Sequence, residues 1–345
     1  MDFGFRNIEI TNFRGIDHLE IGGLAPVNVF VGANNVGKTS ILEAVFMLSG
    51  LSNPQMPTRV NYLRSVLQDS VDSARYLFHN LDFGNRPLLK AGAEGGDRWL
   101  TFAPVMADST EASAGLSFTH SEIARLDFDF GVGGWRQYHA SLSSADDGKI
   151  KQTRPEDYAE KIRCLFIPAD KNDKSAAANF STLVKRNGRQ PVVEALRDFD
   201  PAIESVEALP DGLYLKLAGV GELLPVSMAG DGVRRAVNIL SVVANEDYNM
   251  VLVDEFDNGL HYTAHKKMWR AVLGLAMRRG VQLFVTTHNL DCILGLKSAM
   301  DDNEALRPMV NVYDIVRTKC KGYRSYCYSY DGLREAVDKE IEIRR

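Results

Sequence analysis

A segment at residues 32–39 constrains the fold of this chain more than any other feature, because it fits the pattern GxxxxGK[ST]. The apolar run Val27–Val31 precedes it, and apolar residues at helical spacing follow it. Its glycines let the backbone wrap around phosphate oxygens, Lys38 can reach the β- and γ-phosphates, and Thr39 can ligate Mg²⁺. The pattern predicts a strand, a loop that binds a nucleoside triphosphate, and a helix. The residues expected around the nucleotide are Gly32, Ala33, Asn34, Asn35, Val36, Gly37, Lys38, Thr39 and Ser40.

A second apolar run, Met250–Val253, ends in two acids. We expect Asp254 to hold Mg²⁺ beside Thr39, and Glu255 to polarise the attacking water. Two adjacent acids suit this chemistry because metal ligation and base catalysis are separate tasks. Acids at a strand end can also form a helix cap or a solvated turn, but pairing with the phosphate loop favours the catalytic interpretation.

Histidines supply a third candidate feature. His288 follows the predicted strand Val281–Val285, where it could hydrogen-bond the γ-phosphate and assist catalysis, and an N-capping or core histidine is an equal alternative. His261 and His265 are four residues apart but lack the HExxH pattern of a metal site. We therefore expect His265 on a solvated helix face.

Alternating strands and helices in the second half of the chain predict a parallel sheet. Two short runs, Trp99–Phe102 and Leu126–Phe130, predict antiparallel strands. We expect one bilobed unit over residues 1–345. Its nucleotide-binding core, with a helical lobe, takes approximately residues 1–50 and 160–345, and a helical and β-rich side lobe takes approximately 51–160.

Composition narrows the function further. The 345 residues carry 40 Lys and Arg against 45 Asp and Glu, a formal net charge of −5, so the chain is not a polycation that coats nucleic acid. No apolar stretch approaches the roughly 20 residues of a membrane helix, and the first residues lack a signal peptide pattern. The 4 cysteines form no CxxC pair. We expect a cytoplasmic protein with no membrane partner.

Taken in order along the chain, these motifs resemble those of the ABC-type ATPases of the SMC and RecF group, and within it the ATPase part of the OLD (overcoming lysogenization defect) family. Ile8–Gly15 resembles the family's opening strand and NFRG turn, which implies that Arg14 lies near the phosphates or the rest of the nucleotide. Ser227–Arg235 resembles its degenerate signature motif, although Asp231 stands between the glycines, and an ordinary turn is the alternative. Asp254–His261 resembles the joined Walker B and D-loop, and Thr286–Asn289 the H-loop.

The resemblance implies an α/β P-loop NTPase of the ABC-ATPase head type, with a mixed or parallel core sheet, an antiparallel β side lobe and a helical lobe. It also implies a head-to-head dimer around two ATP and Mg²⁺, in which the signature turn of one protomer caps the γ-phosphate held by the other. Lys38, Glu255 and His288 would be catalytic, and Thr39 and Asp254 would bind the metal. The trans signature residues would be Ser227, Gly230, Asp231, Gly232 and Arg235, and the D-loop residues Asp257 and Asn258.

Two features of related proteins are not expected. The stretch after His288 is short for a Toprim nuclease domain of roughly 100 residues. The pair Asp127 and Asp129 alternates with apolar residues, which is typical of the solvent face of a strand rather than of a metal site. Between Lys38 and Asp254 no heptad pattern predicts the coiled coil of an SMC rod.

Three functions remain as hypotheses. The first is an ATPase sensor or switch in prokaryotic anti-phage defence, acting on a separately encoded effector protein. The second is a RecF-like clamp that binds DNA when ATP dimerises it, and the third is a scaffold that binds nucleotide without hydrolysis. The net charge favours a protein partner over DNA. For the clamp, the candidate basic patch is Lys171, Lys174, Lys185, Arg186 and Arg189, with a solvated helix face as the alternative.

Overall fold

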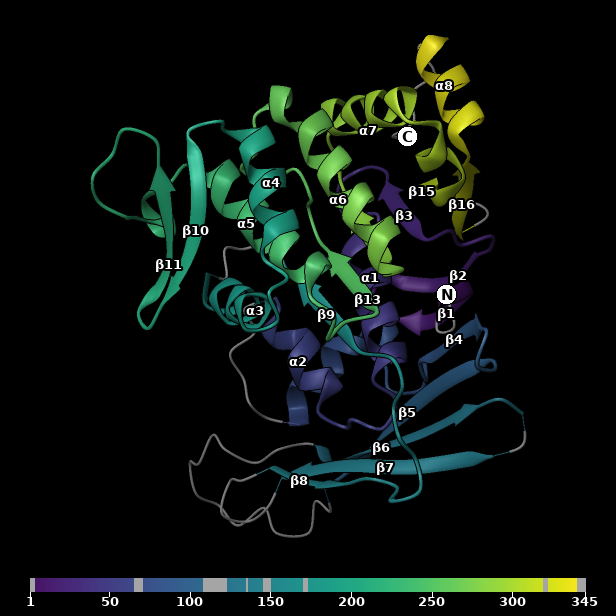
Figure 1. Ribbon diagram of the computed structural model, residues 1–345. Coiled ribbons are helices and arrows are strands. Elements are labelled where there is room, and N and C mark those ends of the chain that lie inside the picture. The colour runs from purple at the N-terminus through teal and green to yellow at the C-terminus, as the bar shows by residue number, and fades with distance from the viewer. Residues whose placement is uncertain are drawn as a thin grey trace, which may run out of the picture.

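The computed structural model describes residues 4–64, 71–107, 123–134, 136–144, 150–169, 173–318 and 322–339. Its centre is a six-stranded sheet in the order β16-β15-β3-β14-β13-β9 (Figure 1). All neighbours pair in parallel except β16, which is antiparallel to β15. The expected parallel sheet is therefore confirmed. The strands are β3 Val27–Val31, β9 Cys164–Ile167, β13 Met250–Val253, β14 Gln282–Thr286, β15 Val310–Thr318 and β16 Gly322–Tyr328.

Helices cover both faces of this sheet because alternate strand residues face opposite sides and are apolar on both. Phe30 packs with α1 on one face, whereas Val29 and Val31 pack with α3 to α7 on the other. The helices are α1 Lys38–Ser49, α2 Met56–Tyr62, α3 Asp173–Lys185, α4 Gln190–Phe199, α5 Asp231–Ala244, α6 His265–Arg279, α7 Leu290–Asp302 and α8 Tyr330–Asp338. Short 3₁₀ helices lie at Val71–Leu77, His79–Leu81, Val226–Met228, Tyr262–Ala264 and Glu304–Met309.

A seven-stranded antiparallel sheet, which we term the side sheet, lies below the core in Figure 1, in the order β2-β1-β4-β5-β6-β7-β8. Its alternating apolar residues pack against α1 in one hydrophobic cluster. The expected antiparallel strands at 99–102 and 126–130 fall in β5 and β6. The strands are β1 Phe5–Phe13, β2 Ile16–Ile21, β4 Leu88–Ala93, β5 Arg98–Met106, β6 Ile123–Val132, β7 Gln137–Ser144 and β8 Ile150–Thr153.

A third, three-stranded sheet projects at the left of Figure 1, beside α3 and α4. It consists of β10 Ile203–Leu209, β11 Gly212–Leu217 and β12 Leu224–Pro225. The architecture is thus the predicted α/β class, with a mixed core sheet, an antiparallel β side lobe and a helical lobe. Among the described residues, no helix is both long and apolar enough to span a bilayer.

One expectation about a helix face is wrong. His265, predicted on a solvated face, is fully buried at the start of α6. The reason lies in the neighbouring helix α7, whose Gly295 has no side chain. A Cβ at Gly295 would come within 2.7 Å of the His265 Cβ, so only glycine permits this close helix approach. A sequence pattern within α6 alone could not reveal this contact.

Candidate nucleotide-binding site

The phosphate loop joins β3 to α1 at the carboxyl end of the core sheet, where ligands bind in open α/β sheets. Gly32 and Gly37 have φ angles of 140° and 92°, and Asn35 has 62°, so three positions adopt backbone that most residues avoid. A Cβ at Gly32 would lie 2.4 Å from the carbonyl oxygen of Ile315. The glycines are therefore required by the fold of the loop itself.

Lys38, the first residue of α1, lies across this loop. Its Nζ donates hydrogen bonds to the carbonyl oxygens of Gly32 and Ala33, each at 2.9 Å. Burial lowers the pKa of Lys38, while the carboxylates of Glu255, Asp254 and, less strongly, Asp314 act to raise it. The Lys38 ammonium group therefore lies on the phosphate loop, within electrostatic range of the two acids that follow β13.

Thr39 and Asp254 come together although they are far apart in sequence. The Thr39 hydroxyl lies 3.1 and 3.0 Å from the two carboxylate oxygens of Asp254. Thr286 donates a further hydrogen bond of 2.6 Å to Asp254 Oδ1. A hydroxyl beside a carboxylate is the oxygen donor set that Mg²⁺ prefers, so these residues fit the expected metal. Thr286 was not among the predicted site residues.

Glu255 follows Asp254 in a strained backbone conformation, with a φ of 47°. Its N–H donates to the Thr286 hydroxyl at 2.9 Å, which fixes the peptide before it. Its side chain is 44% exposed, and Oε1 lies 3.7 Å from Nδ1 of His288, which is 47% exposed. The turn therefore presents the carboxylate and the imidazole together, beside the phosphate loop.

The D-loop residues occupy two kinds of position. Asp257 is buried and accepts a 2.6 Å hydrogen bond from the Thr287 hydroxyl. Asn258 is exposed and donates through Nδ2 to the carbonyl of Ala169 at 3.0 Å. Thr286 and Thr287 at the end of β14 thus hold the segment after β13 at two successive places.

The predicted signature turn leads into α5. Gly230 caps this helix and Asp231 begins it, and the two residues are exposed together with Ser227. Asp231 forms an ion pair with Arg234 one turn later. Gly232 lies against the D-loop, since a Cβ there would come within 3.3 Å of the Gly259 carbonyl. The turn is accessible, as a contact with a second protomer requires.

Arg235 departs from the expectation that placed it with the trans signature residues. Its side chain is buried, and its guanidinium donates to the carbonyl oxygens of Pro168, Asp254 and Glu255 in its own chain. A guanidinium committed to these carbonyls does not reach outward to a partner. The sequence offered no sign of this, because Arg234 and Arg235 are adjacent and only the helix geometry separates them.

Arg14 has a buried partner that sequence reasoning missed. Its Nε lies 2.7 Å from Oε2 of Glu43, a fully buried acid on α1, and Glu43 also pairs with Arg64 at 2.6 Å. Burial lowers the pKa of Arg14, and the Glu43 charge opposes this. Arg64 also lies 3.4 Å from the hydroxyl of Ser40. The ion network therefore connects Arg14 to the helix that begins at the phosphate loop.

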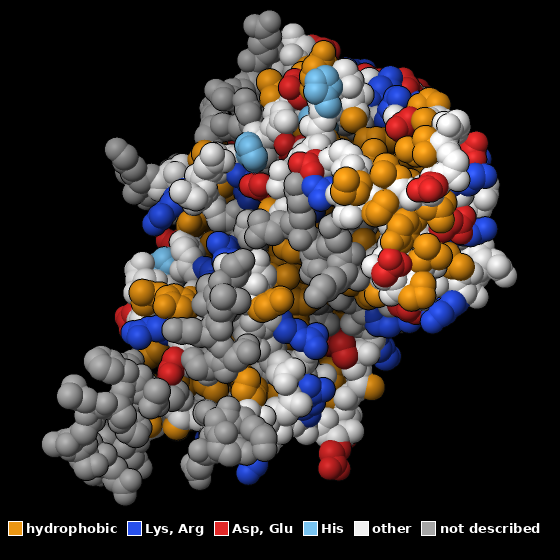
Figure 2. Space-filling view, turned by 90° about the vertical axis from the view of Figure 1, so that its left-hand side faces the viewer, with side chains coloured by type: hydrophobic (Ala, Val, Ile, Leu, Met, Phe, Trp, Pro, Cys, Tyr) orange, Lys and Arg blue, Asp and Glu red, His pale blue; other side chains and the backbone are white. Residues whose placement is uncertain are grey.

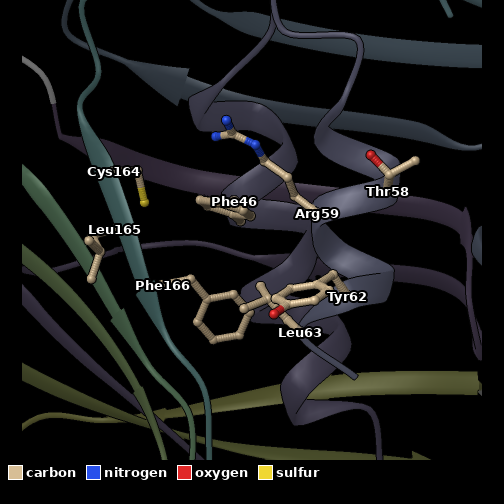
Figure 3. Close-up of a pocket in the computed structure, with 8 residues that line it drawn as sticks. All are labelled: Phe46, Thr58, Arg59, Tyr62, Leu63, Cys164, Leu165 and Phe166. Carbon is tan, nitrogen blue, oxygen red and sulfur yellow. The ribbon is translucent and has the colours of Figure 1, made fainter. Parts of the chain in front are cut away.

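A cavity of about 440 Å³ lies between β9 and α2 (Figure 3). In this view β9 contributes one wall, α2 the opposite wall, and Phe46 of α1 lies between them. None of the predicted nucleotide-binding side chains lines it. The lining residues are Phe46, Thr58, Arg59, Tyr62, Leu63, Cys164, Leu165 and Phe166.

Of the five residues in the predicted basic patch, two form ion pairs in the described structure, and Lys185 is exposed. Arg186 pairs with Asp247 and Arg189 with Glu207. Lys171 and the side chain of Lys174 lie outside the described residues. On the face in Figure 2, the described Lys and Arg side chains are interspersed with Asp and Glu. The geometry therefore favours the solvated-face interpretation for Arg186 and Arg189.

Family models match the chain in two overlapping segments. Residues 118–292 match the model described as "AAA domain, putative AbiEii toxin, Type IV TA system". Residues 5–166 match the model described as "AAA ATPase domain". Together the two matches include the phosphate loop, the signature turn, the two acids that follow β13, and His288.

Individual relatives agree with these models. An "ATP/GTP phosphatase" of Helicobacter pylori is 22% identical over 323 residues, which cover 84% of this chain and 86% of that protein. The "DNA replication and repair protein RecF" of Nitrosococcus oceani is 39% identical over 69 residues, only 20% of this chain and 18% of RecF.

Solved structures show the same fold at low identity. An SMC head bound to the C-winged helix domain of ScpA has a TM-score of 0.53 and 12% identity, over 95% of this chain and 98% of that one. An SMC head domain with an extended coiled coil, bound to the C-terminal domain of ScpA from Pyrococcus furiosus, has a TM-score of 0.51 and 10% identity, over 99% and 100%.

Proposed function

Because the chain belongs to the AAA-domain family whose model matches residues 118–292, we propose that the residues at the carboxyl end of its core sheet hydrolyse ATP. The chain is an ATPase of the SMC and RecF type, given its family models, its phosphatase relative and its SMC-head fold. The observation that carries the residue assignment is the contact of Thr39 with both carboxylate oxygens of Asp254. It joins the phosphate loop to the acidic strand end.

Each residue then has a chemical task. Lys38 and the loop amides bind the β- and γ-phosphates, while Thr39 and Asp254 hold Mg²⁺. The bound metal supplies charge neutralisation at the phosphate oxygens. Glu255 orients the attacking water and accepts its proton, and His288 donates a hydrogen bond toward the γ-phosphate. Thr286 positions both acids, because its hydroxyl contacts the Asp254 carboxylate and the Glu255 N–H.

We further propose a head-to-head dimer around two ATP molecules. The exposed turn Ser227–Gly232 supports this, since helix N-terminal amides favour an anion and no side chain of the turn's glycines blocks close approach. Gly230, Asp231 and Gly232 would cap the γ-phosphate held by the partner. The D-loop residue Asn258 is also exposed, and the next residue, Gly259, lies against Gly232 of this turn. A monomer should therefore turn over ATP slowly.

The output of such a dimer would be an OLD-like switch that controls a separately encoded effector, in anti-phage defence. Two findings support a protein partner. The family description names a type IV toxin–antitoxin system, and two SMC heads of the same fold are bound to domains of ScpA. Purification from the native host, with and without ATP, tests this. A partner that is released or bound only with ATP is expected, and a protein that purifies alone under both conditions would contradict it.

Turnover itself is tested by comparing the wild type with Lys38→Ala. We expect Mg²⁺-dependent release of phosphate from ATP by the wild type only. Equal, background turnover of both proteins would contradict hydrolysis and favour the scaffold hypothesis.

A RecF-like DNA clamp is the second candidate, favoured by the local match to RecF over 69 residues. It predicts duplex binding that requires ATP and weakens steeply with salt. The ion pairs of Arg186 and Arg189 weigh against it, because these cations are already neutralised. Duplex binding that is absent at 50 mM salt with ATP present would exclude the clamp.

A further inference from the structure

Arg235 lies where three parts of the site meet. Its Nη1 donates to the Pro168 carbonyl at 2.9 Å, just beyond the end of β9. Its Nη2 donates to the carbonyls of Asp254 at 2.6 Å and Glu255 at 3.0 Å, just beyond the end of β13. A single guanidinium from α5 therefore holds the two neighbouring strand ends together, and one of them carries the proposed catalytic base.

Burying this cation needs compensation. Burial lowers the pKa of Arg235 to about 10, and the charges of Asp254, Asp257 and Glu255 act in the opposite direction. The arginine therefore remains charged at neutral pH, and the three acids that oppose its desolvation all belong to the turn after β13. A buried charge is costly unless its partners are well placed, so this geometry is specified closely.

The peptide that Arg235 holds is strained. Glu255 has a φ of 47°, a conformation that a non-glycine residue keeps only where the surroundings impose it. Thr286 accepts a hydrogen bond from the Glu255 N–H, and Arg235 donates one to the Glu255 carbonyl. The residue is thus fixed from both sides, from β14 and from α5, and its carboxylate direction depends on both contacts.

The helix that carries Arg235 begins at the exposed turn Ser227–Gly232, one turn earlier. In addition to the contact of Arg235 with the Glu255 carbonyl, α5 contacts the D-loop through Asp231 and Gly232. A Cβ at Gly259, whose φ is 77°, would lie 2.9 Å from the Asp231 Cβ. The first two turns of α5 therefore contact both the D-loop and the Glu255 carbonyl, and these contacts give a displacement of this helix a route to both.

From these contacts we infer that Arg235 is a positioning residue for Glu255 of its own protomer, and that α5 couples engagement of the exposed turn to the orientation of this base. The inference rests on the proposed ATPase dimer. It assigns the guanidinium to the site within its own chain, whereas the turn that precedes it serves the site of the partner.

A heterodimer separates this assignment from a trans role. One protomer carries Arg235→Met and the other Glu255→Gln, with a heterodimer of wild type and Glu255→Gln as the reference. If Arg235 acts on its own protomer, each site holds one damaged base, and turnover falls far below the reference, to no more than that of the Arg235→Met homodimer. If Arg235 acted in trans, both substitutions would lie in one site, and turnover equal to the reference would overturn the inference.

Homodimers supply the readouts that a merely structural role would not produce. We expect Arg235→Met to lower kcat for ATP about 100-fold while KM changes less than about twofold, because a small misplacement of a base is costly. Arg235→Lys should restore part of kcat, since it keeps the charge but not the paired donors. A raised KM with unchanged kcat would contradict the inference.

ATP-dependent dimerisation gives the deciding control if the reference heterodimer is itself inactive. In a Glu255→Gln background, Arg235→Met should leave the ATP-dependent dimer intact, and its loss would overturn the assignment. Failure of the proposed function is recognised separately, because the wild type would then show no turnover above Lys38→Ala.

Discussion

The core sheet and the side sheet treat their polar side chains in opposite ways. At the carboxyl end of the core sheet, the polar side chains are buried and paired. Thr286 donates a hydrogen bond to Asp254, and Thr287 donates one to Asp257. On the side sheet, Asp127 pairs with Arg125 and Asp129 with His139, and both carboxylates are partly exposed to solvent. Both regions contain strands with buried apolar residues, so hydrophobic burial alone does not explain the difference.

The difference indicates that the core sheet carries destabilising features at the site where the proposed hydrolysis takes place. Buried polar groups cost free energy unless each is hydrogen-bonded, and the strained backbone of Glu255 adds to that cost. The side sheet has the alternation of an ordinary amphipathic sheet, with Phe102 and Phe128 inside and charges outside. Substitutions should therefore affect turnover in the first region and folding stability in the second.

The largest effect on turnover should follow loss of the loop lysine. Lys38→Ala removes the cation that would bind the β- and γ-phosphates, and we expect kcat/KM for ATP to fall at least about 100-fold. Lys90→Ala removes a lysine whose exposed ion pair with Glu9 lies on the side sheet. Steady-state phosphate release should be unchanged in this control. A comparable loss of turnover in both variants would contradict the specific role of Lys38.

Loss of one site hydroxyl should have an intermediate effect. Thr286→Val leaves the shape nearly unchanged but removes the contacts to Asp254 and to the Glu255 N–H. We expect kcat to fall about 10-fold, since a buried donor and acceptor lose their partner. Thr153→Val, which removes a hydroxyl pair with Ser141 on the side sheet, should keep wild-type kcat. Equal kcat for both variants would show that Thr286 does not position the acids.

A core substitution in the side sheet should reverse the pattern. Phe102 is buried and contacts Phe78 and Phe128, with ring centroids 5.4 and 5.9 Å apart. Phe102→Ala should lower the free energy of unfolding by about 3–5 kcal/mol, measured by denaturant titration. The folded fraction should keep the wild-type kcat. A large loss of kcat in fully folded protein would mean that the side sheet contributes directly to catalysis.

The smallest effect should follow a charge change on the side sheet. Asp129 pairs with His139 at an exposed position. Asp129→Asn should change the free energy of unfolding by less than about 0.5 kcal/mol and leave turnover unchanged. A metal-dependent loss of activity would instead revive the Asp127 and Asp129 pair as a metal site.

Much of the fold could be predicted because its signals are local. The run Val27–Val31 and the glycines after it predict a strand and a loop without knowledge of the rest of the chain. Motif order predicts Asp254 beside Thr39, and the structure brings these two side chains together. Periodicity and turn chemistry were sufficient for these elements.

The remainder depends on contacts between distant segments. The position of Arg235 after a glycine turn predicts a contact with the partner protomer. Its side chain instead points to the ends of β9 and β13, because α5 crosses the sheet there. His265 is buried because Gly295, thirty residues away on another helix, leaves room for it. Glu43 belongs to no recognisable motif, and only the structure shows that it forms ion pairs with both Arg14 and Arg64.

In the proposed dimer, ATP joins two copies of this chain through the exposed turn and the phosphate loop. Glu255→Gln removes the base but keeps the shape, so ATP and Mg²⁺ should bind without being hydrolysed. The mass in solution, measured by light scattering for this variant, should double with ATP and Mg²⁺ and return to the starting value with ADP. A mass that is the same with ATP, with ADP and without nucleotide would show that ATP does not join two copies of the chain.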